Sequence, residues 1–347
     1  PPRSTPLYSS AASDVYKRQV FGSPDGGLVV GRGPFESHPA PPKKGVAFYR
    51  NDFALSCSQP WFVPSRVESL PPGDSPDFLM EEFPEIVWED PEVDSFAEVF
   101  AEVSQAIRSG SIEKSVPVAT ANGKLRRGSC KGLGSALSRW SAPQRPYGWI
   151  DGDEGVVGLS PELLFELSDG ILHAMALAGT ARVEEREAFE ADEKEIREHE
   201  FVAQTLLSKL SDLGETIRHP REIMDLGPLV HYHSAIDVEL GKKETIDRLV
   251  SLLHPTPALG PLPRTSETLA DLISWRHRLG CPLWFGSPFG LFQDGACEIL
   301  VAIRMVHWLG KKVSVPSGCG VIEESRLVSE WRELRLKRES VRSMFGV

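Results

Sequence analysis

Carboxylates border the apolar face of an expected helix between Glu187 and Leu213. Apolar residues recur there at helical spacing, namely Phe189, Ile196, Ala203, Leu206, Leu210 and Leu213. At about 100° per residue, Glu198 lies about 40° from Val202, at the edge of the buried face, with Glu195 one turn back. A carboxylate at that edge can be partly desolvated. A solvated charged face is the alternative for this charge run taken alone.

A second expected helix, from Leu327 to Phe345, carries Glu330, Glu333 and Lys337 along one edge of its apolar stripe. If the two acidic borders face one another, they form a site made only of oxygen ligands. Such a site suits Mg²⁺ better than zinc, because Mg²⁺ takes few carboxylates and keeps waters or substrate oxygens. The two helices together therefore predict a magnesium site.

Lys114 and Glu162 are candidates for proton transfer. Lys114 stands at the start of a short expected strand, EKSVPVA, and an isolated lysine is usually a surface residue unless its context places it in a pocket. Glu162 follows Pro161 and precedes the apolar run Leu163 to Phe165. A carboxyl group among apolar neighbours should have a raised pKa, as a general acid near neutral pH requires. A strand-end glutamate in water is the alternative.

Further polar residues interrupt expected strands. Gly179 and Thr180 end the second strand of an expected hairpin, where a small residue lets a ligand approach backbone N–H groups, although a plain turn is the alternative. His231 and His233 lie on one side of another strand but lack a third zinc ligand. Arg304 interrupts an apolar run. A buried arginine is costly unless it is paired, so a carboxylate partner from protein or ligand is expected.

Composition limits the classes of partner. The chain has 347 residues, 41% of them hydrophobic, and a net charge of −11, which argues against nucleic acid or anionic membranes as main partners. No apolar run reaches the roughly 18 residues of a membrane span, and no signal peptide is expected. Five scattered cysteines without CxxC spacing fit a reducing cytoplasm. We therefore expect a cytoplasmic protein; the sequence does not indicate its oligomeric state, and a monomer is only the default expectation.

Two regions are expected in the chain. Residues 1–19 lack periodicity and an initiating methionine, so they are interpreted as a non-native or disordered leader. Residues 20–347 are predicted to form a single catalytic domain, with the informative motifs between 96 and 345. Within it, the segment SLLHPTPALGPLPRTSETLADLI predicts a proline-rich fixed loop over a site, followed by a helix capped near Thr265 or Ser266.

The ordered motifs of the chain resemble those of the chorismate-utilising enzymes, which comprise isochorismate, salicylate, anthranilate and aminodeoxychorismate synthases. The motifs are GLSPELLFEL, LAGTAR, DEKEIREHEFV, LLHPTPALG, VAIR, SGCGVI and SEWRELRLK. The resemblance implies an α+β domain in which two antiparallel sheets pack together, with helices outside and a buried site for Mg²⁺ and chorismate.

The resemblance also implies roles for single residues. Glu198 and Glu333 would bind Mg²⁺, with Glu195 and Glu330 close by. The enolpyruvyl carboxylate would be held by Arg304 and by the backbone around Gly318 and Gly320. The remaining pocket residues would be Gly179, Thr180, His231, Ala258 and Lys337.

Two positions distinguish the branches of this family. Ammonia-using members typically have glutamine at the position of Lys114, and the aminodeoxychorismate branch has a nucleophilic lysine at the position of Ala178. The resemblance therefore implies water as the nucleophile. Lys114 would act as general base on the water that attacks C2, and Glu162 would protonate the departing C4 hydroxyl to give isochorismate.

Other interpretations and some departures stay open. Salicylate synthases share the lysine and the acid and then eliminate pyruvate, although the loop HPTPALG favours isochorismate synthase. A catalytically silent chorismate-binding protein is the second alternative. Pro117 and Ala119 stand where the family strand usually reads like VVLAR, and Val238 replaces a usual glycine. Whether the product would serve menaquinone, siderophore or salicylate synthesis is not indicated.

Overall fold

The computed structural model describes residues 16–89 and 91–347. Its strands are β1 (Arg18–Gly22), β2 (Leu28–His38), β3 (Val46–Arg50), β4 (Trp61–Leu70), β5 (Glu85–Glu89), β6 (Val118–Arg127), β7 (Arg145–Asp151), β8 (Glu154–Ser160), β9 (Leu163–Ser168), β10 (Ile171–Arg182), β11 (Gly214–Arg218), β12 (Glu222–Leu226), β13 (Leu229–Leu240), β14 (Pro288–Gln293), β15 (Ala296–Val301), β16 (Met305–Leu309) and β17 (Lys312–Gly318). Its α-helices are α2 (Val93–Arg108), α3 (Arg186–Phe189), α4 (Glu193–Leu210), α5 (Ile246–Leu253), α6 (Ser266–Arg278) and α7 (Leu327–Phe345). Short 3₁₀ helices are η1 (Asp77–Leu79), η2 (Cys130–Arg139) and η3 (Val183–Glu185).

Antiparallel hydrogen bonding links the strands in one continuous order. Strands β11 and β12 both pair with β13, and the order continues through β10, β9, β15, β14, β3, β4, β2, β1, β7, β8, β16, β17, β6 and β5. The α+β prediction is confirmed. The two expected layers are joined by strand pairing rather than formed by separate sheets.

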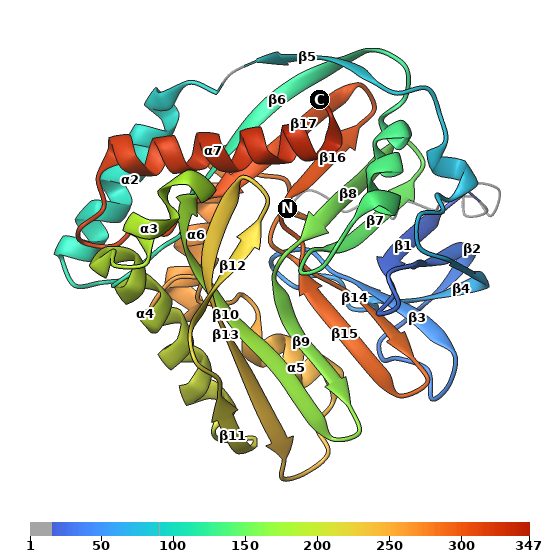
Figure 1. Ribbon diagram of the computed structural model, residues 1–347, viewed down its shortest axis with the longest axis horizontal. Coiled ribbons are helices and arrows are strands. Elements are labelled where there is room, and N and C mark those ends of the chain that lie inside the picture. Colours follow the sequence, from blue (N-terminus) through green and yellow to red (C-terminus); the bar gives the residue numbers. More distant parts are fainter. Residues whose placement is uncertain (1–15, 90) are drawn as a thin grey trace, which may run out of the picture.

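The two halves of this sheet pack face to face around an aromatic core. Tyr147 from β7 and Phe289 from β14 have ring centroids 5.6 Å apart, and Phe21 from β1 stacks on Phe289 at 6.2 Å. Helices cover the outer surfaces: α4 lies along β10 and β13, whereas α7 crosses the end of the molecule that contains β16 and β17 (Figure 1). Because α4 and α7 lie on different parts of the sheet, their acidic borders can approach one pocket from two directions.

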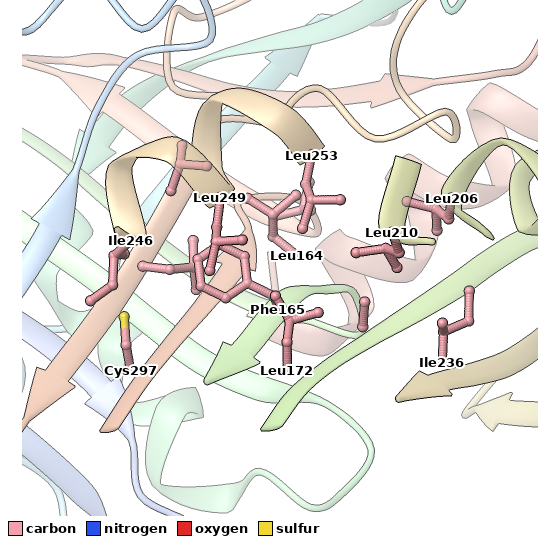
Figure 2. Packing of buried hydrophobic residues seen from close by; sticks show 14 of the residues in the cluster. Leu164, Phe165, Leu172, Leu206, Leu210, Ile236, Ile246, Leu249, Leu253 and Cys297 are labelled. Atoms are coloured by element: carbon pink, nitrogen blue, oxygen red, sulfur yellow. The ribbon is translucent and has the colours of Figure 1, made fainter. Parts of the chain in front are cut away.

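A second core lies beneath α4 and α5 (Figure 2). Leu249 and Leu253 of α5 lie beside Leu164 and Phe165, whereas Leu206 and Leu210 of α4 lie in the same cluster on the side of Ile236. The spacing of four residues places each pair of leucines on one helix face, so burial of apolar area fixes how each helix is rotated. The same rotation sets the direction of Glu198 one turn before Val202.

Some local predictions were wrong. The expected helix from Glu187 to Leu213 is interrupted, since α3 ends at Phe189 and α4 begins at Glu193. The reason is a new N-cap: the Asp192 carboxylate accepts hydrogen bonds from the backbone N–H groups of Lys194 at 3.0 Å and Glu195 at 3.2 Å.

The expected strand EKSVPVA does not form either. Lys114 and Ser115 make isolated bridges to Leu262 and Val321, and β6 begins at Val118, after Pro117. The predicted leader, 1–19, overlaps β1 at Arg18 and Gln19, which pair with β2 and β7. Residues 1–15 lie outside the described residues. Within the described ranges, no helix has both the length and the apolar composition to cross a bilayer.

The core beneath α5 predicts a specific stability cost. Leu249 is fully buried, so Leu249→Ala leaves a cavity and should lower the free energy of unfolding by about 2–5 kcal/mol in urea titrations. Leu309, 56% exposed, is the matched control, and Leu309→Ala should stay within about 0.5 kcal/mol of the parent. Equal losses in both variants would contradict this packing.

Candidate functional site

One pocket collects most of the predicted site residues. It encloses about 680 Å³ including its open mouth, and lies where β10, β13, α4 and α7 meet the loop after α5. The predicted residues that line it are Glu162, Gly179, Thr180, Glu198, His231, Ala258, Arg304, Gly318, Gly320, Glu333 and Lys337. Lys114, Glu195 and Glu330 do not line the pocket; Lys114 pairs with the lining residue Glu198, and Glu195 accepts from the backbone N–H of the lining residue Thr180.

A break in the pairing of β10 with β13 exposes backbone at the pocket. The register shifts between Ala178 and Ala181, and Gly179 there adopts φ +74°, a left-handed conformation that favours glycine. The backbone N–H of Thr180 donates to Glu195 Oε2 at 2.9 Å. The bulge therefore ties the end of β10 to α4.

His231 connects this bulge to Arg304. Its Nδ1 lies 2.7 Å from the Gly179 carbonyl oxygen, so Nδ1 carries the proton and donates. Nε2 is then left to accept from Arg304 Nη2 at 2.9 Å. Burial and the adjacent Arg304 lower the pKa of His231 well below its ordinary value. A neutral histidine that orients the guanidinium is the consistent assignment.

Arg304 is buried without a carboxylate within ion-pair distance in the described part of the chain. The expected protein carboxylate is therefore not found, and His231 takes the place of a partner. Burial lowers the pKa of Arg304 to about 10, despite the charge of Glu333, so it remains a cation at neutral pH. The Arg304 backbone adopts φ +54°, a left-handed conformation. Its carbonyl oxygen accepts a hydrogen bond from the Leu159 N–H at 3.1 Å, which helps to hold this conformation. Arg304 is available to bind an anionic ligand.

Glu162 lies in the pocket wall with only 4% of its surface exposed. Thr256, from the loop after α5, donates its hydroxyl to Glu162 Oε1 at 2.8 Å. Burial raises the pKa of Glu162 to about 7, although this hydrogen bond and the ammonium groups of Lys114 and Lys337 lower it. A pKa of about 7 lets this side chain hold or release a proton near neutral pH.

Each pocket-facing glutamate of α4 and α7 has its own lysine. Lys114 is fully buried with Nζ 3.2 Å from Glu198 Oε1, and Lys337 Nζ lies 2.5 Å from Glu333 Oε1. Lys337 also donates to the Gly318 carbonyl oxygen at 3.0 Å. Burial raises the pKa of Glu198, but Lys114 and the other lysines lower it by more, so it stays ionised. These pairs fix the charged side of the pocket.

Glu195 and Glu330 lie near Glu198 and Glu333 but do not line the pocket. Together with Glu198 and Glu333 they form what we call the four-glutamate cluster. Lys194 Nζ bridges the rear pair, 3.1 Å from Glu195 Oε1 and 3.5 Å from Glu330 Oε1. Both Glu330 oxygens are buried and form no hydrogen bond within the described residues. Burial and the charge of Glu333 raise the pKa of Glu330 to about 7.

The four-glutamate cluster is not a ready-made metal cage. Among residues 16–89 and 91–347, no three Asp, Glu, His or Cys side chains converge closely enough to enclose an ion. The donor set still fits Mg²⁺, which is commonly held by one or two carboxylates and completed by waters and substrate oxygens. The unsatisfied buried oxygens of Glu330 are a local sign of this capacity, since buried carboxylates normally have partners.

Several neighbours of the pocket were not predicted. They are Thr256, Lys194, Leu259, Phe285, Ile303 and Ser317. Thr256 and Leu259 had a usable signal, because both lie in the loop HPTPALG that was expected over a site. His233 points elsewhere and pairs with Glu222 at 2.9 Å, so it shares no ligand with His231.

Comparison with known proteins identifies the family. Residues 74–346 match the family model described as chorismate binding enzyme. The chain belongs to this family of chorismate-binding enzymes. The resemblance expected from the motifs is therefore confirmed.

Named relatives of this chorismate-binding enzyme include isochorismate synthases. Isochorismate synthase EntC of Escherichia coli strain K12 is 31% identical over 209 residues, which is 56% of this chain and 52% of that protein. MenF of Haemophilus influenzae is 28% identical over 210 residues, 57% of this chain and 48% of that protein. The chain thus spans about half the length of the curated relatives it matches.

Solved structures share the fold. The menaquinone-specific isochorismate synthase MenF from Escherichia coli superposes with a TM-score of 0.80 at 19% identity, covering 97% of this chain and 92% of that chain. Anthranilate synthase component I from Streptococcus pneumoniae gives a TM-score of 0.66 at 14% identity, covering 94% and 90%. The chorismate-utilising-enzyme fold is therefore shown, while the reaction is a separate question.

The raised pKa of Glu162 predicts a pH-dependent stability difference in this chorismate-binding enzyme. Its value of about 7 in the folded chain exceeds the ordinary 4.5, so the wild type loses stability as pH rises towards and through 7. Glu162→Gln cannot ionise. From pH 5 to pH 8 the variant should therefore gain up to about 3 kcal/mol relative to the wild type in urea unfolding.

A surface carboxylate provides the control for this measurement. Glu215 on β11 is exposed, and Glu215→Gln should differ from the wild type by the same amount at both pH values, within about 0.5 kcal/mol. If the Glu162→Gln difference is also the same at pH 5 and pH 8, the carboxyl group is not protonated in the folded chain at neutral pH.

Proposed function

We propose that this chain is an isochorismate synthase that converts chorismate to isochorismate with Mg²⁺. The carrying observation is that buried Glu162 lines the pocket and that buried Lys114 pairs with the lining residue Glu198, while Ala178 in the wall offers no nucleophile. The pocket therefore has a candidate base and a candidate acid, and leaves the attack to water. Relatives named isochorismate synthase support the same reaction.

The charges of the pocket suit a substrate with two carboxylates. Arg304 has no carboxylate partner among the described residues, and Lys337 is fixed beside Gly318. We assign the enolpyruvyl carboxylate to Arg304 and the backbone around Gly318 and Gly320. Bidentate binding by a guanidinium orients a planar carboxylate, and His231 holds that guanidinium in place. The walls near Ala258 and Gly179 then face the rest of the substrate.

Proton transfer by the two buried groups accounts for the reaction. We assign Lys114 as the base that takes a proton from the water whose oxygen bonds to C2. The ring double bonds shift, the bond from C4 to its hydroxyl breaks, and Glu162 donates the proton that makes this leaving group water. One water enters and one leaves, so substrate and product are isomers. The pKa of about 7 keeps much of Glu162 protonated at neutral pH.

The metal site is assigned to Glu198 and Glu333, with Glu195 and Glu330 close by. When bound there, Mg²⁺ supplies positive charge that neutralises the ring carboxylate of chorismate. Lys114 holds the Glu198 carboxylate in position, and Lys337 holds the Glu333 carboxylate. The unsatisfied oxygens of Glu330 support this assignment.

Product analysis tests the proposal. The purified protein is incubated with chorismate and MgCl₂, and the products are separated by chromatography, with EDTA or ammonium added in parallel. Isochorismate in equilibrium with chorismate, lost with EDTA and unaffected by ammonium, is the expected result. Salicylate with pyruvate would move the assignment to salicylate synthase. An aminated product, or no product at all, would overturn the proposal.

Lys114 is predicted to be needed for turnover. Removing the amine in Lys114→Ala removes the base, and general bases contribute about 10²–10⁴-fold, so kcat for isochorismate formation should fall by at least about 100-fold. Chorismate binding, measured by isothermal titration, should remain. Lys311→Ala, at an exposed turn, is the control and should keep wild-type kcat. Loss of chorismate binding together with turnover would contradict a role limited to proton transfer.

Gly320 is predicted to be irreplaceable because of space. A Cβ there would collide with Glu198 Oε1 and approach Lys114 Cε to 2.8 Å. Gly320→Ala must therefore displace the base or the metal ligand, and kcat/KM for chorismate should fall at least about tenfold. Gly241 is the matched control, since a Cβ there would meet only the Leu213 carbonyl oxygen at 3.6 Å. Normal kcat/KM in Gly320→Ala would contradict the observed packing.

A further inference from the structure

We propose that Lys194 is a tethered counter-cation of the four-glutamate cluster that weakens its binding of divalent cations. The inference rests on the proposed function in one respect, because it takes this cluster to be the Mg²⁺ site. It goes further by assigning a role to a lysine that faces away from the substrate pocket and that the proposed reaction does not use.

The position of Lys194 is unusual for its place in the helix. Lys194 and Glu195 are adjacent in α4, so their side chains leave the helix in different directions. The Lys194 stem nevertheless brings Nζ to 3.1 Å from Glu195 Oε1 and 3.5 Å from Glu330 Oε1 on α7. About one third of the Lys194 side chain stays exposed, whereas the Glu330 side chain is 1% exposed. The ammonium group therefore covers the rear of the cluster from the solvent side.

The distribution of charges explains why this lysine matters. Glu198 is paired with Lys114, and Glu333 with Lys337. Lys194 then serves Glu195 and Glu330 together, although burial opposes its charged form. Its Nζ lies within ion-pair distance of both carboxylates. Four glutamates thus have three lysines, and Lys194 is the one shared between two of them.

The Lys194 ammonium pairs with Glu195 and Glu330, and a divalent ion held by Glu198 and Glu333 would lie in the same four-glutamate cluster. Lys194 Nζ lies 3.5 Å from Glu330 Oε1, and its charge stabilises the ionised form of Glu330 more than the Ser325 hydroxyl does. A divalent ion in the cluster is repelled by this single positive charge over a few ångströms at low dielectric. Without the charge, the glutamates should bind a divalent cation more tightly.

Metal binding without substrate tests this role. Lys194→Met keeps the aliphatic stem and removes the charge. We expect the dissociation constant for Mn²⁺, measured from free Mn²⁺ by electron paramagnetic resonance and for Mg²⁺ by isothermal titration, to fall at least tenfold. The control is Arg197→Met on the same helix, where an exposed arginine pairs with Glu324 outside the cluster. Its dissociation constant should stay within twofold of the wild type.

Two more variants make the test specific. Lys194→Arg retains the charge and should bind Mn²⁺ within about twofold of the wild type. The double variant Lys194→Met with Glu330→Gln removes the charge of Lys194 and also the charge of Glu330, so the gain in affinity should largely disappear. If Lys194→Met does not fold, as checked by circular dichroism, Lys194→Gln carries the same expectation. Wild-type or weaker affinity in the charge-removing variant overturns the inference.

Failure of this inference differs from failure of the proposed function. If the wild type forms isochorismate while Lys194→Met binds Mn²⁺ no more tightly, the role of Lys194 is wrong and the reaction stands. If the wild type forms no product while Lys194→Met binds Mn²⁺ at least tenfold more tightly, the counter-cation role stands and the reaction is wrong.

Discussion

Burial of like charges in one place is the constraint on which this structure depends. Four glutamates meet between α4 and α7, and such a group is stable only when cations lie within a few ångströms. The cations come from separate parts of the chain: Lys114 precedes β6, Lys194 lies in α4 and Lys337 lies in α7. The ion pairs therefore hold the helices and the segment before β6 in one arrangement, and that arrangement forms the pocket.

The sheet contributes to the pocket through its irregularities rather than its regular pairing. The bulge at Gly179 turns two backbone groups out of register, one towards His231 and the other towards Glu195. Arg304 lies at the break between β15 and β16 in a left-handed conformation. Regular antiparallel pairing would use these backbone groups in the ladder and leave none for a ligand. The strained positions thus coincide with the groups assigned to substrate binding.

The pocket separates two electrostatic environments over a short span. The acidic helices and their lysines keep Glu198 ionised, whereas Glu162 lies in the apolar wall with one hydroxyl partner and a pKa of about 7. The proposed reaction uses the carboxyl groups of these two environments differently, for charge neutralisation and for proton transfer. The fold achieves this by placing the first group on helices and the second at the start of a buried strand.

The sequence determined which residues are chemically capable, because helix periodicity and strand patterning are local. It predicted the edge positions of Glu198 and Glu333, the apolar setting of Glu162 and the α+β class, the last through resemblance. Tertiary structure decided the partners. The break before α4, the bond from Thr256 to Glu162, the pairing of Arg304 with His231 and the bridge from Lys194 to Glu330 all depend on distant or competing contacts. The partner of a buried charged group is the group that tertiary packing brings close to it. The spacing of residues along one helix or strand does not determine which distant group that is.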